Sequence, residues 1–253
     1  MAEESLLRIS NLTKIYRKSH LGRVHETTGV KDLSLEIFHG EIFGLLGLNG
    51  AGKTTTLKLI LGLLFPTEGE VRLFGKKLPD SSAIRQVGFL PETPYFPKHF
   101  TVKEMLEFYG LLSGVPEKEI ANKAQDVLKT VNMFQNQGKR IKECSKGMLQ
   151  RLSLAQALIH DPRLLVLDEP ITGLDPLGLA EMREMILRLN REGKTILFSS
   201  HIISEVEKIA GRVGILSGGK LIRVIPSQDW RDKTGALENM FVETVKSAGG
   251  VEI

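Results

Sequence analysis

The stretch Gly47-Leu-Asn-Gly-Ala-Gly-Lys-Thr-Thr55 decides how the fold of this chain is interpreted. It follows an apolar run, residues 42–46, that predicts a buried strand, and it leads into a segment of helical character. In this strand-then-helix context, the pattern Gly-x-x-x-x-Gly-Lys-Thr predicts a phosphate-binding loop. The glycines allow consecutive backbone N–H groups to turn inward, and the positive end of the helix points at the same place. The predicted nucleotide-binding residues of this stretch are Gly47, Leu48, Asn49, Gly50, Ala51, Gly52, Lys53, Thr54 and Thr55.

Two side chains of the loop carry the predicted chemistry. Lys53 is expected to reach the β- and γ-phosphates of ATP or GTP, and the Thr54 hydroxyl is expected to ligate Mg²⁺. The alternative is a glycine-rich turn that happens to include a lysine. The residue pattern together with its context favours the nucleotide site.

A second pattern lies near the middle of the chain, where the apolar run 164–167 ends in Asp168-Glu169-Pro170. The run has the length of a strand buried on both faces of a parallel sheet, and ligands of such sheets bind at the carboxyl ends of the strands. Two adjacent carboxylates there are unfavourable unless a metal ion, a proton or a positive charge meets them. We therefore expect Asp168 to hold Mg²⁺ and Glu169 to position or deprotonate the attacking water, in preference to a surface acidic turn.

Composition limits the class of protein. The 253 residues are 42% hydrophobic and 25% charged, as in a soluble globular protein, and the net charge of +4 comes without a block of like charge that would suggest a nucleic-acid-binding arm. The single cysteine, Cys144, excludes an intrachain disulfide and a four-cysteine zinc site, which favours a reducing compartment. The N-terminal residues do not resemble a signal peptide, and no run approaches the roughly 18 apolar residues of a membrane span, so we expect a chain that does not cross a membrane by itself.

The rest of the chain predicts alternating strands and helices, the pattern of an α/β protein. Residues 6–9 and 33–37 predict two strands joined by a long loop or an extended hairpin. Further strands are expected at 70–74, 87–90, 195–199, 213–216 and 220–225, and helices at 54–64, 101–112, 117–131, 149–158, 176–193 and 237–246. Thr101 and Glu104 predict a capping box at the start of the first of the two helices at 101–131, and Ile120 and Leu128 share one face of the second. These helices would form an insert between two strands of one sheet. Asp175 is expected to cap the helix at 176–193, with Pro176 as its first residue.

Two isolated side chains remain ambiguous from the residues alone. Tyr16 lies ahead of the phosphate loop, where it could stack on a nucleotide base or pack as a half-buried aromatic. His201 follows the strand at 195–199, where it could approach the phosphates or be structural.

With these motifs in order, the chain from about Leu6 to about Ile225 resembles the nucleotide-binding subunit of an ATP-binding cassette (ABC) transporter. The diagnostic segment of that family usually reads Leu-Ser-Gly-Gly-Gln, and two stretches compete for it. Leu216-Ser-Gly-Gly-Lys220 is closer in letters, but it follows the Asp-Glu pair and suits a hairpin turn. Cys144-Ser-Lys-Gly-Met148 precedes a helix that leads to the Asp-Glu strand, and this position identifies it as the signature segment.

The resemblance also implies roles for single residues. Ser145 and Gly147 would bind the γ-phosphate of the partner subunit's nucleotide at a helix N-terminus. Lys146, where the family usually has glycine, would either add a cation near the nucleotide or point to solvent. Tyr16 would stack on the adenine, and His201 would contact the γ-phosphate. Glu92, where the family usually has glutamine, would contact the metal ion and the nucleotide. The loop Thr172–Asp175, with Asp175 near the nucleotide, would couple the two sites of a dimer.

The resemblance implies a P-loop NTPase core with an N-terminal antiparallel β region and an inserted helical subdomain at about 92–147, within a domain covering residues 1–225, and a short tail at 226–253. It implies ATP and Mg²⁺ as cofactors and a second ABC subunit, alike or different, bound head to tail. It also implies a separate polytopic membrane permease that the chain would power in the direction of export, from the inner face of the cell membrane. No nucleic-acid partner is expected. The alternatives are a non-transport ABC ATPase acting on ribosomes or DNA, which usually carries two cassettes, coiled-coil arms or zinc-binding cysteines, and a cassette that only regulates a channel.

Overall fold

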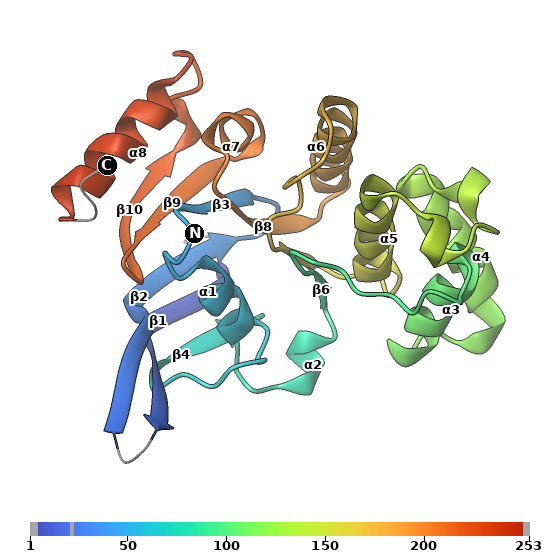
Figure 1. The fold of residues 1–253 in the computed structure, drawn as a ribbon, viewed down its shortest axis with the longest axis horizontal. Helices are drawn as coiled ribbons and strands as arrows, with labels where there is room; N and C mark the ends of the chain where they lie inside the picture. Colours follow the sequence, from blue (N-terminus) through green and yellow to red (C-terminus); the bar gives the residue numbers. More distant parts are fainter. Residues whose placement is uncertain (1–4, 21–22, 250–253) are drawn as a thin grey trace. The chain divides into compact units, whose positions relative to one another are not determined.

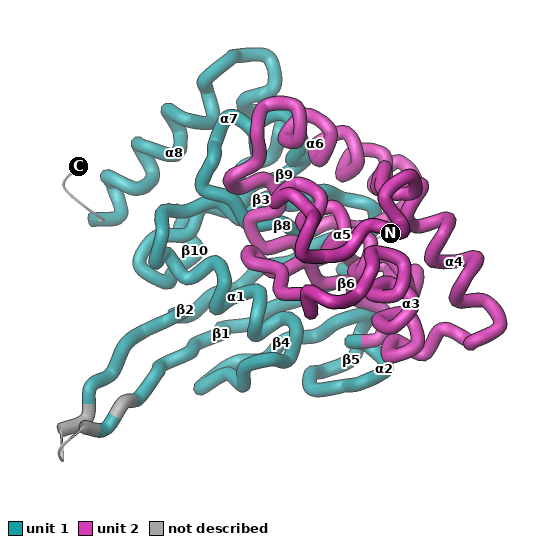
Figure 2. Tube along the Cα trace, turned by 45° about the vertical axis from the view of Figure 1, so that its right-hand side comes forward, with its two compact units in different colours: residues 1–84, 197–253 teal, residues 85–196 magenta. Residues whose placement is uncertain are grey.

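The computed structural model describes residues 5–20 and 23–249, and it has the α/β architecture that the sequence predicts. The chain divides into two compact units, one made of residues 1–84 and 197–253 and the other of residues 85–196 (Figure 2). The helices are α1 (Lys53–Ile60), α2 (Ser81–Ile84), α3 (Val102–Leu112), α4 (Glu117–Thr130), α5 (Lys146–Leu158), α6 (Pro176–Arg191), α7 (Ile203–Ile209) and α8 (Ala236–Ser247). The strands are β1 (Ser5–His20), β2 (Arg23–Phe38), β3 (Ile42–Gly47), β4 (Glu68–Leu73), β5 (Lys76–Lys77), β6 (Val87–Leu90), β7 (Leu164–Leu167), β8 (Thr195–Ser200), β9 (Arg212–Ser217) and β10 (Lys220–Pro226).

The first unit contains an antiparallel sheet with strand order β2-β1-β4-β5. Strands β1 and β2 run side by side over their whole described length, as Figure 1 shows, so the extended hairpin is the alternative that the structure adopts. Its inner half alternates buried side chains such as Leu7, Ile9 and Leu35 with exposed ones, the period of a strand with one covered face. The outer half of the hairpin is polar. There Arg17 on β1 lies opposite Glu26 on β2 and forms a 2.8 Å ion pair with it.

The same unit contains a mixed sheet in which β10, β9, β3 and β8 lie in that order. Strand β3 runs parallel to β9, and β9 and β10 form the antiparallel hairpin that the sequence predicts. All residues of β3 and β8 are buried, as expected of central strands. Helix α7 packs so closely on β3 that a Cβ at Gly44 would lie 3.0 Å from Val206.

Helix α8 covers part of this sheet and confirms the helix predicted near the C-terminal end. Its buried side chains, Leu237, Phe241 and Val245, recur at helical spacing and face β9, β10 and α7, beside which α8 lies in Figure 1. Trp230, just before α8, is 1% exposed. The residues after Ile225 therefore pack as part of the first unit, up to the last described residue, 249.

The second unit contains the parallel pair β6 and β7 and the helices α3, α4, α5 and α6. Helices α3, α4 and α5 pack on one another, and they gather together in Figure 1. Helix α3 begins with the predicted capping box, in which the side chains of Thr101 and Glu104 each accept from the other residue's backbone N–H. Helix α4 buries the predicted face that includes Ile120 and Leu128. The boundary of a helical subdomain at about 92–147 stays a prediction.

Three local predictions differ from the structure. Helix α1 ends at Ile60 and not near Leu64, because Gly62 turns into the left-handed region at φ 67° and Leu63 N–H donates back to the Lys58 carbonyl oxygen at 2.9 Å, a common helix C-terminus. Helices α2 and α7 were not predicted, since four and seven residues are too few to show a clear helical period. In the described part of the chain, no helix has the length and apolar character needed to span a bilayer.

Candidate functional site: the phosphate loop and the carboxylate strand

The phosphate loop of the first unit joins β3 to α1 and is shaped by two glycines that nothing larger could replace. Gly52 has φ 105°, and a Cβ there would lie 2.6 Å from the Gly29 carbonyl oxygen. A Cβ at Gly47 would lie 2.7 Å from the Leu216 carbonyl oxygen. The loop therefore needs glycine both for its backbone conformation and for its close approach to neighbouring strands.

Lys53 lies at the start of α1 with its side chain folded back over the loop. Its Nζ donates to the Gly47 carbonyl oxygen at 2.8 Å and to the Leu48 carbonyl oxygen at 3.4 Å, and the residue is only 7% exposed. A buried ammonium group and the positive end of α1 both favour an anion at this loop. The first turn of α1 has no acidic residue that would oppose one.

The hairpin between β9 and β10 supports the phosphate loop, a role that the sequence analysis missed. Gly219 N–H donates to the Ala51 carbonyl oxygen at 3.1 Å, and the Gly219 carbonyl oxygen accepts from Lys31 N–H at 2.7 Å. The stretch Leu216–Lys220 is thus a hairpin turn, as predicted, but its second glycine also ties the phosphate loop to β2. Only the close approach in three dimensions reveals this, since the loop and the turn are far apart in sequence.

Tyr16 lies in β1 beside the phosphate loop. Its hydroxyl is 3.2 Å from Thr55 Oγ1, and its ring lies so near the backbone of Gly29 that a Cβ there would be 2.6 Å from the ring. Lys14 Nζ is 5.6 Å from the ring centroid. The structure brings Tyr16 to the predicted site, and its stacking on a base stays a prediction.

His201 follows β8 in the first unit and is exposed. It lies inside a turn in which Ser200 Oγ accepts from Ile202 N–H at 3.0 Å, so this bond fixes the backbone on both sides of it. Its contact with the γ-phosphate stays a prediction.

In the second unit, the predicted acidic residues gather at the carboxyl ends of β6 and β7. The two strands end level with each other at Leu90 and Leu167, and Asp168 N–H donates to the Leu90 carbonyl oxygen at 2.8 Å. Asp168 and Glu169 are 3% and 5% exposed, whereas Glu92 is exposed. The predicted metal ligands Asp168 and Glu92 therefore both follow the carboxyl ends of this parallel strand pair.

Glu169 has an unusual backbone conformation. Its φ is 49°, in the left-handed region that residues other than glycine rarely adopt. Its carboxylate oxygen Oε2 accepts from the Thr172 hydroxyl at 2.8 Å. Strained backbone of this kind is common at functional sites, where the surrounding structure holds it in place.

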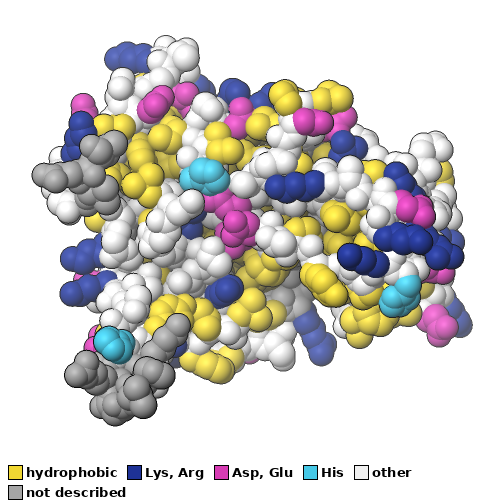
Figure 3. Space-filling view, in the orientation of Figure 1, with side chains coloured by type: hydrophobic (Ala, Val, Ile, Leu, Met, Phe, Trp, Pro, Cys, Tyr) yellow, Lys and Arg dark blue, Asp and Glu magenta, His cyan; other side chains and the backbone are white. Residues whose placement is uncertain are grey.

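The segment predicted as the signature forms the N-terminus of α5. Ser145 caps the helix, its Oγ accepting from Met148 N–H at 3.3 Å, and no acidic residue lies in the first turn. Exposed cations surround this end, Arg140, Lys142 and Lys146, and on the face drawn in Figure 3 Lys and Arg side chains gather over the helices of the second unit. A helix N-terminus with this much positive charge favours an anionic ligand.

Lys146 is exposed, and its side chain lies along the loop that follows Glu169, so its predicted place near the nucleotide or in solvent stays open. A Cβ at Gly173 would lie 1.9 Å from Lys146 Nζ, so the ammonium group rests against the loop that follows Glu169. Asp175, at the end of that loop, caps α6 by accepting from Gly178 N–H at 2.7 Å. The signature segment and the loop 172–175 therefore touch within the second unit.

These features agree with a comparison to known families. A family model described as "ABC transporter" matches residues 30–172, more than half of the chain. The chain belongs to the ABC transporter family. Its matched part begins within β2 and ends in the loop after Glu169, so it includes the phosphate loop, the signature segment and the carboxylate strand.

Relatives within the ABC transporter family carry ATP-binding names. A Nostoc protein named as an uncharacterized ABC transporter ATP-binding protein is 46% identical over 220 residues, which are 86% of this chain and 65% of that protein. The bacitracin transport ATP-binding protein of Enterococcus faecalis is 41% identical over 228 residues, 89% of this chain and 70% of that protein. The chain thus spans less than two thirds of the Nostoc relative.

Solved structures of ABC cassettes share the fold. The structure of an ATP-binding subunit of an ABC transporter superposes with a TM-score of 0.79 at 29% identity, covering 95% of this chain and 100% of that one. A dimeric ATP-binding cassette in a post-hydrolysis state, bound to ADP and Pi, superposes with a TM-score of 0.78 at 25% identity, covering 87% and 98%. This chain therefore shares the predicted α/β fold with solved cassettes of ABC transporters.

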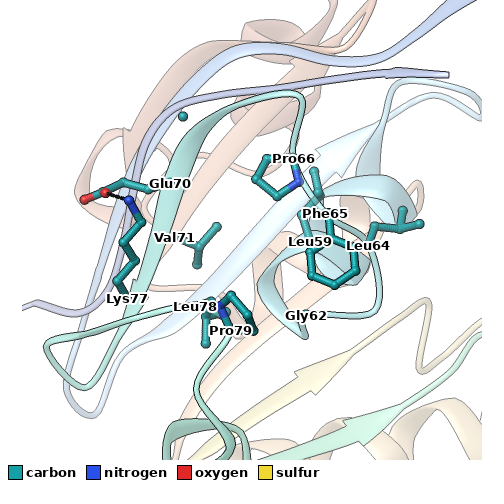
Figure 4. A pocket seen from close by; sticks show the side chains of 11 residues that line it. Leu59, Gly62, Leu64, Phe65, Pro66, Glu70, Val71, Lys77, Leu78 and Pro79 are labelled. Atoms are coloured by element: carbon teal, nitrogen blue, oxygen red, sulfur yellow. Dashed lines mark ion pairs between the residues drawn. The ribbon is translucent and has the colours of Figure 1, made fainter. Parts of the chain in front are cut away.

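A pocket elsewhere in the first unit does not compete with the phosphate loop as the nucleotide site of this ABC cassette. It lies between the end of α1 and β4, and Figure 4 shows the apolar side chains of Leu59, Phe65 and Val71 around it. The charged residues that line it, Glu70 and Lys77, form a 2.8 Å ion pair with each other. Because the Lys77 ammonium group is already paired with a carboxylate, this lining brings less free positive charge to a triphosphate than the phosphate loop does.

Proposed function

We propose that this chain binds and hydrolyses ATP and thereby powers a separate transmembrane permease, in the direction of export. The observation that carries the proposal is the phosphate loop itself: a buried strand, β3, leads through glycines with no room for side chains to the N-terminus of α1, with Lys53 folded over the loop. The same chain carries Asp168 and Glu169 at the end of a buried strand. Both parts are needed for a cassette that hydrolyses ATP as well as binding it.

The predicted residues divide the chemistry between them. Lys53 and the N–H groups of the loop would hold the β- and γ-phosphates, and His201 would contact the γ-phosphate. Glu169 would position the attacking water and accept its proton as the water oxygen bonds to the γ-phosphorus and the ADP oxygen leaves. Tyr16 would stack on the adenine.

Mg²⁺ fits the oxygen ligands that the chain offers. The predicted ligands Thr54, Asp168 and Glu92 supply only hard oxygen atoms, and among the described residues no three His, Cys, Asp or Glu side chains cluster tightly enough to enclose a metal ion by themselves. Mg²⁺ is commonly held by one or two carboxylates together with phosphate oxygens and water. When bound, it would neutralise charge on the phosphates, and Asp168 would hold and orient it.

A second cassette completes the proposed site. Ser145 and Gly147, at the positive end of α5, would bind the γ-phosphate held by a partner bound head to tail, and Asp175 would lie near the same junction. ATP would close the dimer because each nucleotide contacts both subunits, and hydrolysis would reopen it. The dimeric cassette bound to ADP and Pi supports this arrangement.

The permease would dock on an apolar surface of the second unit. Tyr95 and Leu112 are 83% and 68% exposed, and Phe108 and Leu111 are also exposed on α3. Exposed apolar side chains gathered in one region are typical of a protein interface. On this proposal residues 1–225 form the cassette, with a helical subdomain at about 92–147, and the chain works at the inner face of the cell membrane.

Glu169→Gln tests the proposed function. The variant should bind ATP with unchanged affinity and hydrolyse it slower by orders of magnitude, because the amide cannot accept the proton of the attacking water. Phosphate release and ATP affinity would be measured for both proteins, and Glu26→Gln, at an exposed ion pair of the first unit, is the matched control. A variant that turns over ATP at the wild-type rate would refute the assignment.

The same variant tests the partner. Glu169→Gln protein held with Mg-ATP should capture a polytopic membrane protein from detergent-solubilised cells. Capture of ribosomes or DNA in its place would refute the transport role while leaving ATP hydrolysis intact.

A further inference from the structure

We propose that Thr172 is a positioning residue for Glu169: its hydroxyl fixes the orientation of the carboxylate that acts on the attacking water. The proposal rests on the function proposed above and assigns a role to a residue of the loop that follows the carboxylate strand. All the contacts that carry it lie within the second unit.

The contact itself is short and direct. Thr172 Oγ1 donates to Glu169 Oε2 at 2.8 Å, and Thr172 N–H donates to the Glu169 carbonyl oxygen at 3.2 Å. The two bonds close a tight turn from residue 169 to residue 172. A hydroxyl bonded to an ionised carboxylate is among the stronger hydrogen bonds of a protein, and here it defines which way the carboxylate plane faces.

The backbone of Glu169 shows that its position is held by its surroundings. Its φ of 49° is unfavourable for a residue with a side chain, and Glu169 is 5% exposed. A residue keeps such a conformation only when neighbouring contacts over-determine it. The turn closed by Thr172 is one of those contacts.

Helix α5 holds the loop from its other side. Gln150 Nε2, on the buried face of α5, donates to the Pro170 carbonyl oxygen at 3.0 Å. Lys146 Nζ rests against Gly173, and a Cβ at Gly147 would lie 3.8 Å from Leu174. Because the loop is fixed at residues 170, 173 and 174, Thr172 has little freedom to move away from Glu169.

A fixed carboxylate matters because the attacking water must meet both the base and the phosphorus at once. Small departures from the reactive geometry lower the rate steeply. Removing the Thr172 hydroxyl should therefore lower kcat. The KM for Mg-ATP should stay nearly unchanged, because the phosphate loop that binds the nucleotide and the Glu169 carboxylate are both still present.

The test compares Thr172→Val, which keeps the shape of the side chain without its hydroxyl, with Thr172→Ser, which keeps the hydroxyl. Thr172→Val should lose about tenfold or more in kcat at nearly constant KM, and Thr172→Ser should restore most of the rate. Thr130→Val is the matched control, since the Thr130 hydroxyl donates to the Asp126 carbonyl oxygen within α4 and lies outside the proposed site. Thermal unfolding and ATP affinity would verify that each variant is folded.

A double-substitution cycle shows whether Thr172 acts through Glu169. In the Glu169→Gln background, single-turnover hydrolysis should not fall further when Thr172→Val is added, because the positioned group is already gone. Equal losses in the Ser and Val variants, an unchanged kcat in Thr172→Val, or an additive loss in the double variant would each overturn the proposal. Absence of ATP hydrolysis in the unaltered chain would instead refute the proposed function, so the two failures are distinguishable.

Discussion

His160, in the second unit just after α5, is a histidine held in its neutral form. Burial lowers its pKa, and the positive charges of Lys123 and Lys194 act in the same direction. The hydrogen bond between its ring Nε2 and the Val87 carbonyl oxygen, at 3.1 Å, and the nearby charge of Asp161 oppose the shift but do not cancel it. Ring atom Nδ1 is buried and bonds to none of the residues that the structure describes, which makes adding a proton there unfavourable.

The lowered pKa of His160 predicts a loss of stability in mild acid. Because the folded pKa lies below the unfolded one, the stability is complete above the unfolded pKa and declines as the pH falls through about 6.5 towards the folded pKa. From about pH 7 to pH 5, the free energy of unfolding in urea should fall more for the unaltered chain than for His160→Gln. His39→Gln, at an exposed histidine, is the control. Parallel pH profiles for the chain and for His160→Gln would contradict the prediction.

Single residues also show which parts of the site a sequence can predict. Lys53 and Asp168 were found because their motifs are continuous in sequence, and the structure puts each in the predicted strand-end context. Neither Gly29 nor Gly219 was found, because their role is to let the phosphate loop approach other strands, a contact between segments that no local pattern records. The bond from Thr172 to Glu169 was missed because it depends on the unusual backbone of residue 169.

At the scale of elements, capping chemistry was the most informative local signal. The box Thr101–Glu104 placed the start of α3 correctly, and Asp175 followed by Pro176 placed the start of α6. The end of α1 was placed too late, since the apolar residues continue beyond Gly62 although the helix does not. An apolar run in the sequence indicates which residues are buried. The end of the helix depends on where the backbone leaves the helical conformation, here at Gly62.

The cap of α3 allows a stability prediction. Thr101→Ala removes the hydroxyl that accepts from Glu104 N–H and should lower the free energy of unfolding of the chain by about 1 kcal/mol. Thr130→Ala on α4, whose hydroxyl bonds to a backbone carbonyl within the helix, should change it by less than about 0.5 kcal/mol. Urea titrations of the three proteins measure both values. Equal effects of the two substitutions would show that the cap adds nothing.

At the scale of the whole molecule, the proposed head-to-tail arrangement would divide the residues of one site between two chains. Each proposed site takes Lys53 and Glu169 from one subunit and Ser145 from the other. On this proposal, a substitution at Ser145 would damage the site of the partner and not that of its own chain. No contact within a single chain can report this arrangement, which makes a mixing experiment informative.

Mixing two inactive variants should restore activity. Ser145→Ala and Glu169→Gln should each hydrolyse ATP poorly alone. Combined in equal amounts, half of the dimers are mixed and carry one intact site, so about a quarter of the wild-type rate is expected if the sites act independently. A mixture of Glu169→Gln with Lys53→Ala is the control. Lys53 and Glu169 belong to the part of the site that one subunit supplies, so each site of a mixed dimer would carry one of the two substitutions and none would be intact. Failure of the first mixture to exceed the sum of its parts would contradict the head-to-tail dimer.

The hairpin Leu216–Lys220 matches the family signature in its letters, yet its glycine at 219 serves to approach the phosphate loop and β2. In a random mutational screen for loss of transport, damaging changes would accumulate at this hairpin as well as at Ser145–Gly147. Sorted by phenotype, the two groups would separate: those in the hairpin would weaken retention of the nucleotide, and those at the signature segment would leave it bound but unreacted. A screen that scored only the loss of transport would therefore not separate the two groups. It could assign the role of the signature segment to the hairpin, because the hairpin sequence resembles the family motif.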